Sequence, residues 1–430
     1  MNKEILRLAI PNILSNISIP LLGTVDTALM GRLSPLHIAA VGVGGMIFNF
    51  IYWNFGFLRM GTTGITAQAF GAEDMNKQAA TLFQAIIVAL SLALLVFIFS
   101  VPLMNIGGNL LNLEGEQLVV VKEYFFIRIW DAPATLMLYA LMGWLFGMQN
   151  AWYPMLVTIM INVCNIALSY TLVIHYQLEI EGVAWGTVIA QYMGLVLIIT
   201  LILIRYPQAR NGLSVVTDRF WKRIRMFLTV NTNIFIRTLC LTLAFGIFYS
   251  HSSSLGSLLL ATNVILLLFV NWMSYAVDGF AYAAESIVGK YKGRNSDTGL
   301  NKSIRLSFIW GGGIALLIGL CYLVFGNVFL QIFTDSPEVI ALANEYLIWV
   351  VLFPVLAFGC YIWDGIYIGL TAVHAMRDAM IIAFLLFLGL LYTIGETFGN
   401  HGLWASLVAF MVFRGGIQWL FFARKGLAIR

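Results

Sequence analysis

Nine charged residues lie inside long apolar stretches of the chain, where a charge is expected to be costly. On insertion scales a charged side chain at the centre of a bilayer costs about 2.5–3.5 kcal/mol, so it is expected to have a function or a buried partner. The acids are Asp26, Asp131, Asp278, Glu285 and Asp364, and the bases are Arg59, Arg128, Arg237 and Arg414. The chemistry to consider is therefore proton uptake, cation binding and ion pairing inside a membrane.

Asp26 lies in the first apolar stretch, residues 5–31, together with polar side chains such as Asn16 and two prolines, one of them Pro20. Proline frees backbone carbonyls in a membrane helix, so this stretch has the means to form a polar site around the acid. If Asp26 does not meet Arg59, it is a candidate proton site. The alternative is a structural acid that a neighbouring arginine neutralises.

The second half of the chain holds a larger group of intramembrane charges. Asp278 and Glu285 are seven residues apart in YAVDGFAYAAES, which is two helical turns, so they share one face of a helix. With Asp364 and Arg237 they would form a cluster of three acids and one base. Such a cluster cannot be fully ionised without cost, so at least one carboxyl group is expected to be protonated or to bind a cation.

Two further polar pairs have local spacing. Arg128 and Asp131 are at i, i+3 on one helix and are expected to form an ion pair with a structural role. Asn162 and Asn165 could hydrogen-bond a polar ligand or the acid of the first stretch, or could join neighbouring helices.

The composition is that of a polytopic membrane protein. Of 430 residues, 60% are hydrophobic and 10% are charged, where soluble domains have roughly 25% charged residues. The net charge of +4 comes from particular loops rather than a continuous basic face, so we expect no nucleic-acid partner. The four cysteines lie in apolar runs without CxxC spacing and are expected to be free thiols, with no metal site. The basic N-terminus lacks a cleavage site, which indicates a retained first helix.

About twelve membrane spans are expected from the apolar stretches. Their extents are 5–31, 37–71, 77–105, 118–148, 153–174, 182–205, 224–250, 256–289, 300–332, 339–371, 376–396 and 402–423. A cytoplasmic N-terminus would place eighteen lysines and arginines inside and only Arg32 and Lys122 outside, which fits the positive-inside rule. The rule holds only for an even number of spans, so both termini are expected to be cytoplasmic.

The halves of the sequence share matching residues at an offset of about 220 positions. A polar interval, 206–223, separates a first six-helix lobe, 1–205, from a second, 224–430. The matching positions are Tyr124 and Tyr346, Pro133 and Pro354, Gly143 and Gly365, Gly147 and Gly369, and Gly182 and Gly402. The fold class predicted is an all-α membrane protein with two six-helix lobes related by a pseudo-two-fold axis along the membrane normal, with a cleft between them. The two Gly-x-x-x-Gly pairs are expected to be close-packing faces.

Five runs of sequence carry a family resemblance over essentially the full length. They are IPNILSNISIPLLGTVDTALMGRL, FLRMGTTGITAQAFGA, YAVDGFAYAAE, YIWDGIYIG and GNHGLWASL. They resemble the multidrug and toxic compound extrusion (MATE) transporters, in particular the DNA-damage-inducible protein F (DinF) branch. The resemblance implies export of small organic molecules, often cationic or amphipathic, driven by inward proton or sodium flow.

The resemblance also implies roles for individual residues. Asp26 matches the first-helix acid taken as proton-responsive in this family, Pro20 lies where that helix is expected to bend, and Asn165 matches a polar partner from the fifth helix. Ser169 stands where many relatives have a second acid, so the first lobe is expected to have one proton site, with Asn16 also lining its cavity.

In the second lobe the resemblance gives a further departure from the family pattern. Asp364 matches an acid of the sodium-linked relatives, but Arg237 stands where their seventh-helix acid would be. A positive charge there would repel sodium, which favours proton coupling.

The resulting hypothesis is a monomeric, proton-coupled exporter that works by alternating access in the bacterial cytoplasmic (inner) membrane, with no cofactor beyond the coupling ion. The alternatives are sodium coupling through the second-lobe acids, and a lipid-linked precursor flippase, which would be expected to have more cations than acids in its cleft. An intramembrane enzyme is disfavoured because the sequence has no HExxH or Gly-x-Ser-x-Gly motif. A channel is disfavoured because no filter-like loop is found.

Overall fold

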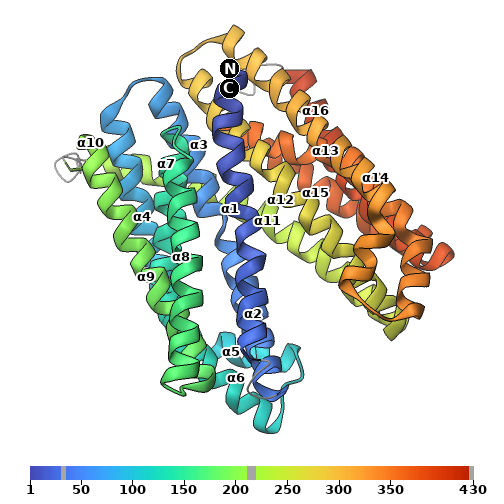
Figure 1. The fold of residues 1–430 in the computed structure, drawn as a ribbon. Helices are drawn as coiled ribbons and strands as arrows, with labels where there is room; N and C mark the ends of the chain where they lie inside the picture. The colour runs from blue at the N-terminus through green and yellow to red at the C-terminus, as the bar shows by residue number, and fades with distance from the viewer. Residues whose placement is uncertain (31–34, 211–218, 426–430) are drawn as a thin grey trace. The chain divides into compact units, whose positions relative to one another are not determined.

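The computed structural model describes the backbone of residues 1–30, 35–210 and 219–425. Side chains are described for the same residues except 19–30, 35, 210, 219–223, 394, 396 and 425. Within these ranges every element is helical, with no strand, as Figure 1 shows. By their internal contacts the residues form two units, Leu14–Leu228 and Met1–Ile13 with Thr229–Arg430, which we call the first and the second lobe.

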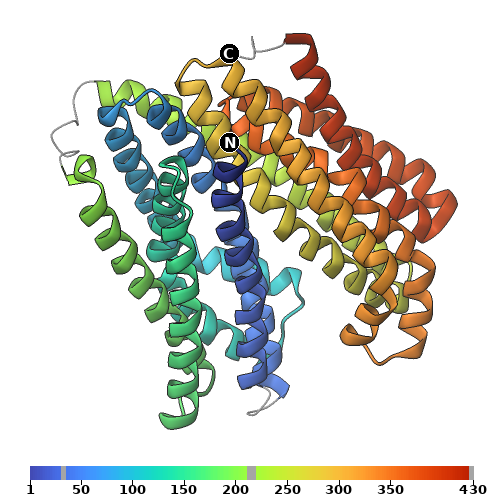
Figure 2. The same ribbon diagram turned by 45° about the horizontal axis from the view of Figure 1, so that its top comes forward.

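Helix α1 (Asn2–Met30) begins in the second lobe and continues into the first. The first lobe then holds α2 (Pro35–Phe55), α3 (Phe57–Gly71), α4 (Met75–Ile98), α5 (Ser100–Leu110), α6 (Gly115–Arg128), the 3-10 turn η1 (Ile129–Asp131), α7 (Ala132–Gly147), α8 (Trp152–Tyr170), the π-helical turn η2 (Thr171–His175), α9 (Glu179–Arg205) and α10 (Pro207–Arg210). The second lobe holds α11 (Arg219–Ser254), α12 (Ser257–Gly293), α13 (Asp297–Phe333), α14 (Pro337–Gly369), α15 (Val373–Leu390), the π-helical turn η4 (Leu391–Gly395) and α16 (Glu396–Lys425). Within this lobe α12, α13 and α14 lie side by side (Figures 1 and 2).

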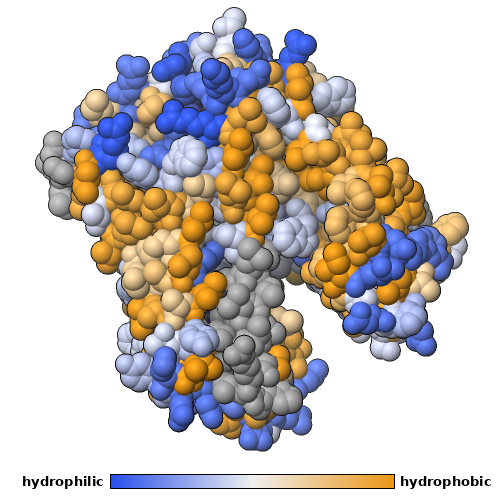
Figure 3. Space-filling view, in the orientation of Figure 1, coloured by the Kyte–Doolittle hydropathy of each residue, from blue (hydrophilic) through white to orange (hydrophobic). Residues whose placement is uncertain are grey.

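The expected membrane spans are confirmed helix by helix. Among the described residues eleven helical segments, from Leu36–Gly71 to Thr397–Arg424, are long and apolar enough to cross a membrane, and they match the second to the twelfth expected span. The first expected span lies in α1, which is 29 residues long. On the face that Figure 3 shows, hydrophobic residues cover much of the described surface, and hydrophilic residues gather mainly toward its upper and lower ends.

Polar residues at the loops set where several helices begin. The Asp74 carboxylate accepts a hydrogen bond of 2.9 Å from the backbone N–H of Lys77 and caps α4. Ser296 caps α13 in the same way, with 3.3 Å to the backbone N–H of Gly299. The long helices between these caps are held by tertiary packing of their apolar faces.

The two Gly-x-x-x-Gly pairs are close-packing faces, as expected. A Cβ added at Gly143 of α7 would lie 2.4 Å from the carbonyl oxygen of Arg59 in α3. In the second lobe a Cβ at Gly365 of α14 would lie 2.1 Å from the carbonyl oxygen of Ala281 in α12. The following glycines of each pair meet the same neighbouring helices one turn further on. Only glycine lets these backbones approach so closely.

The same helix crossings occur in both lobes, at the interval of the sequence repeat. Gly143 and Gly365 are separated along the chain by the same interval as their contacts Arg59 and Ala281. The two π-helical turns, Thr171–His175 and Leu391–Gly395, are separated by nearly the same interval. Helices α3 and α7 therefore correspond to α12 and α14, which supports the duplication inferred from sequence.

The first turns of α1 pack with the second lobe. The Lys290 Nζ donates to the Glu4 carboxylate at 2.7 Å, and a Cβ at Gly279 of α12 would touch Ile13 and the carbonyl oxygen of Ala9. Contacts thus group residues 1–13 with the second half of the chain. The lobe boundaries expected from sequence, 1–205 and 224–430, stay a prediction.

Candidate ion-coupling and polar site

The most completely satisfied intramembrane acid is Asp364, near the end of α14. Arg237 of α11 and Arg414 of α16 both donate through Nη2 to its Oδ2 atom. Its Oδ1 atom accepts a hydrogen bond of 2.7 Å from the Gln418 Nε2. All four side chains are buried. Three helices thus converge on one carboxylate.

Local sequence explains why Arg414 and Gln418 reach the acid together. Arg414 and Gln418 are at i, i+4, so both project from one face of α16. The Arg414 guanidinium lies over the ring of Tyr361, 5.7 Å from its centroid, which gives the charge a second favourable contact. Gly365, directly after Asp364, lets α14 approach α12 closely at the level of the acid.

The arrangement determines what Asp364 can do chemically. A carboxylate with two guanidinium partners and an amide donor is held in its ionised form, because protonation would remove the charge that balances the arginines. Both of its oxygens are used by these donors. Sodium would have to displace an arginine to reach it.

The expectation of one base in this cluster is wrong, since Arg414 joins Arg237 at Asp364. Asp278 and Glu285 lie on the continuous helix α12, as the seven-residue spacing predicts. Asp278 is partly exposed, whereas Glu285 is only 1% exposed, where α12 packs against α14.

In the first lobe the asparagines of α8 join helices together. The Asn162 Nδ2 donates to both the carbonyl and the hydroxyl oxygen of Ser18 in α1, at 3.1 and 2.9 Å. One turn on, the Asn165 Nδ2 donates to the hydroxyl of Thr187 in α9 at 2.8 Å, and the Ser169 hydroxyl lies 3.4 Å from the Asn165 Oδ1. Asn165 and Ser169 have no exposed area, so in this structure they connect α8 to α9 rather than line an open space.

The remaining first-lobe predictions concern α1. Asn16 is partly exposed on that helix. Pro20 and Asp26 lie within the helical range of α1, but their side chains are outside the described residues. Their expected roles as bend and proton site stay predictions.

The expected ion pair of Arg128 and Asp131 is confirmed, with 2.8 Å between Nε and Oδ2. Sequence reasoning missed that the Tyr52 hydroxyl also donates to the other oxygen of Asp131. Arg128 further donates to the Tyr124 hydroxyl at 2.6 Å and lies 5.2 Å from the ring centroid of Phe48. This network, in which Asp131 is fully buried and Arg128 partly so, joins α2, α6 and η1 and supports a structural role.

Two positions of the first lobe that match the charged cluster at Asp364 hold uncharged residues. Met142 directly precedes Gly143 as Asp364 directly precedes Gly365, so an apolar side chain stands in place of the acid. Gly194 follows Gly182 by the same interval as Arg414 follows Gly402, so a glycine stands in place of the base. A Cβ at Gly194 would lie 2.4 Å from the Ile161 side chain, which makes this an apolar contact. The two lobes share a backbone plan but differ in their intramembrane charges.

Comparison with known proteins agrees with this architecture. The family model described as MatE matches the chain twice, over residues 11–171 and 234–393. The chain is 36% identical to the DNA damage-inducible protein F of Escherichia coli, covering 96% of this chain and 90% of that protein. It is 24% identical to the probable multidrug resistance protein NorM of Thermotoga maritima, covering 98% of this chain and 92% of that protein.

Solved structures show the same fold. A point mutant of the Vibrio cholerae MATE transporter VcmN superposes with a TM-score of 0.89 at 19% identity, covering 100% of this chain and 98% of that one. An outward-facing multidrug resistance MATE family transporter of the MOP superfamily superposes equally well, also at 19% identity, covering 100% of this chain and 96% of that one. The chain is therefore a multi-pass membrane protein of the MatE family, the MATE transporters that its sequence resembles.

Proposed function

We propose that this protein exports small organic compounds, often cationic or amphipathic, by alternating access, and that protonation of Asp26 drives the cycle. Membership of a transporter family and the relatives named for multidrug resistance support export. The cytoplasmic (inner) membrane of a bacterium, with both chain ends inside, is the location that the distribution of lysine and arginine favours. We expect a monomer that needs no cofactor beyond the coupling ion.

The choice of proton over sodium as the coupling ion rests on the hydrogen-bond partners of Asp364. Its two oxygens are bonded to Arg237, Arg414 and Gln418, so this acid is neither ready to take up a proton nor open to sodium. This disfavours sodium coupling, because Asp364 is the acid that would be expected to bind the sodium ion. Asp26, on the proline-containing helix, is then the leading acid for coupling.

In the proposed cycle a proton from outside neutralises Asp26, and α1 changes shape around Pro20. The cavity then loses affinity for a cationic substrate, because its negative charge is gone. One charge moving across 100 mV supplies about 2.3 kcal/mol, which supports a modest substrate gradient for each proton.

The test is dye efflux from proteoliposomes, with proton and sodium gradients imposed separately. We expect the proton gradient to drive efflux by the native protein, and Asp26→Asn to abolish that efflux while the purified variant still unfolds at the native temperature. Asp335→Asn, the same substitution at an exposed loop position, is the matched control. Undiminished efflux by Asp26→Asn would refute the coupling role, and efflux driven only by sodium would refute proton coupling.

A further inference from the structure

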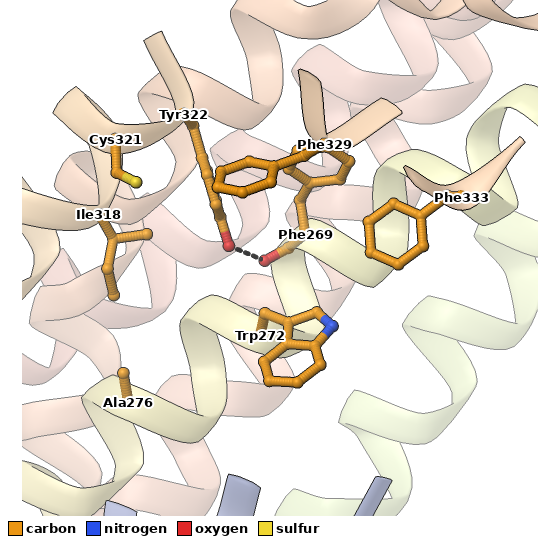
Figure 4. A pocket seen from close by; sticks show the side chains of 8 residues that line it. All are labelled: Phe269, Trp272, Ala276, Ile318, Cys321, Tyr322, Phe329 and Phe333. Carbon is orange, nitrogen blue, oxygen red and sulfur yellow. Dashed lines mark hydrogen bonds between the residues drawn. The ribbon is translucent and has the colours of Figure 1, made fainter. Parts of the chain in front are cut away.

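A cavity of about 400 Å³ opens between α12 and α13 in the second lobe (Figure 4). Phe269, Trp272 and Ala276 line it from α12, at i, i+3 and i+7 on one face near the middle of that 37-residue helix. Cys321 and Tyr322 line it from α13. The cavity is of the size of small-ligand sites in proteins, which begin at about 300 Å³.

The eight residues that line this cavity are mostly aromatic and aliphatic, and their polar side-chain groups are the Tyr322 hydroxyl, the Trp272 indole N–H and the weakly polar thiol of Cys321. The Tyr322 hydroxyl donates to the backbone carbonyl of Phe269 at 2.8 Å, as the dashed line in Figure 4 shows. That hydrogen bond uses the one proton of the hydroxyl, so Tyr322 has no donor left for a ligand. The rings of Phe269 and Tyr322 pack edge to face at 5.1 Å, and the Phe329 ring packs against both. The cavity therefore suits a hydrocarbon ligand.

The cavity lies beside an exposed apolar stripe on α13. Leu317, Leu320, Val324 and Val328 form an exposed apolar stripe on that helix, with exposed fractions of 61%, 51%, 68% and 54%. Cys321 lies beside this stripe and also lines the cavity, by helical spacing. In a helix that crosses the membrane, such a stripe is covered by acyl chains.

We propose that this cavity binds one acyl chain of a bilayer phospholipid. An empty apolar cavity leaves its lining atoms without partners, and the energetic cost rises with its volume. An ordered water usually needs two to four polar partners, and these mostly apolar walls offer few. Acyl chains lie next to the opening at very high local concentration and need none, so the bilayer supplies the ligand that the walls accept.

The inference is independent of which substrate the protein exports or which ion drives export. It predicts a lipid that stays with the second lobe when most lipids are removed by mild detergent. Figure 4 shows the side chains of Ala276 and Cys321 directed toward the open space, so a larger side chain at either position would occupy it.

The first experiment counts the phospholipids that remain bound to the purified protein, by native mass spectrometry. We expect the native protein to retain one phospholipid that Ala276→Phe and Cys321→Phe both lose. Val324→Phe adds the same ring on the exposed stripe and is expected to retain it. Using one filling variant from each helix guards against a folding defect in either. Equal lipid counts in all four proteins would overturn the proposal.

The second experiment uses Trp272, which lines the cavity and is 38% exposed. In proteoliposomes made with lipids brominated on the acyl chain, the fluorescence that Trp272→Phe removes should be strongly quenched. Ala276→Phe should reduce this quenching at least twofold. If aqueous iodide quenches Trp272 and brominated chains do not, the cavity holds water or a polar ligand and the proposal fails.

Discussion

Replacing Asp364 by Asn tests the interpretation of the second-lobe cluster. The substitution keeps the size of the side chain but removes the carboxylate on which two buried guanidinium groups converge. Arg414 has no exposed area and Arg237 is 7% exposed, so neither can recover a full hydration shell. Two cations would then be buried without their common anion.

The magnitude follows from the cost of a buried charge that has lost its partner. Removing one member of a buried ion pair costs about 3–5 kcal/mol, a factor of roughly 150 to 4,000 in the unfolding equilibrium. Arg414→Gln should cost less, about 1.5–3 kcal/mol, because Asp364 keeps Arg237 and Gln418 as partners. The expected order of stability is therefore native, then Arg414→Gln, then Asp364→Asn.

The assay is SDS-induced unfolding in mixed micelles followed by circular dichroism, with Asp335→Asn as the exposed control. If Asp364→Asn is as stable as the native protein but loses ion-driven efflux, Asp364 is a coupling residue and our reasoning is refuted. If Arg414→Gln is the less stable of the two variants, the carboxylate is not the centre of the cluster.

Two further predictions concern packing and pH. Gly365→Ala should destabilise the protein by about 1–3 kcal/mol in the same assay, since its Cβ would meet a backbone oxygen at 2.1 Å. Gly359→Ala on the same helix is the control, because a Cβ there meets no atom within 4 Å, and it should be neutral or slightly stabilising. Equal effects of the two substitutions would contradict the close crossing. Burial opposes ionisation of Glu4, but the hydrogen bond and charge of Lys290 outweigh it and hold its pKa below the ordinary value of 4.5. Because the pKa of Glu4 is lower in the folded than in the unfolded state, its ionised form stabilises the fold above pH 4.5, and this contribution is lost as the pH falls through the folded-state pKa. The unfolding midpoints of the native protein and Glu4→Gln should therefore differ at pH 7 and converge in acid. A difference that stays constant with pH would contradict the contact.

The helices could be predicted from local patterns in the sequence, and the repeat from residues that recur in the same order at one offset. Apolar stretches of sufficient length identify spans, and each of the eleven found among the described residues matches an expected one. The spacing of Gly143 and Gly147 and of Gly365 and Gly369 predicted close crossings, because residues four apart lie on one face of a helix. The Arg128 and Asp131 pair was predictable for the same reason.

The partners of the buried acids could not be predicted in this way. Arg414 is 50 residues from Asp364, and Tyr52 is 79 residues from Asp131, so no periodicity connects them. Arg414 was visible as an intramembrane base in the same half as Asp364, and a charge balance within that half would have brought them together. Tyr52 gave no such signal, because a tyrosine in an apolar stretch is usually a packing or interfacial residue.

The glycine crossings have a mechanical consequence for each lobe. Helices usually shift past one another by sliding on the layer of side chains between them. At Gly143 and Gly365 that layer is missing, because main chain rests directly on main chain. Helices α3 and α7, and likewise α12 and α14, should therefore each move as one rigid pair. The shape changes of a working cycle would have to arise from bending elsewhere or from movement of each pair as a whole.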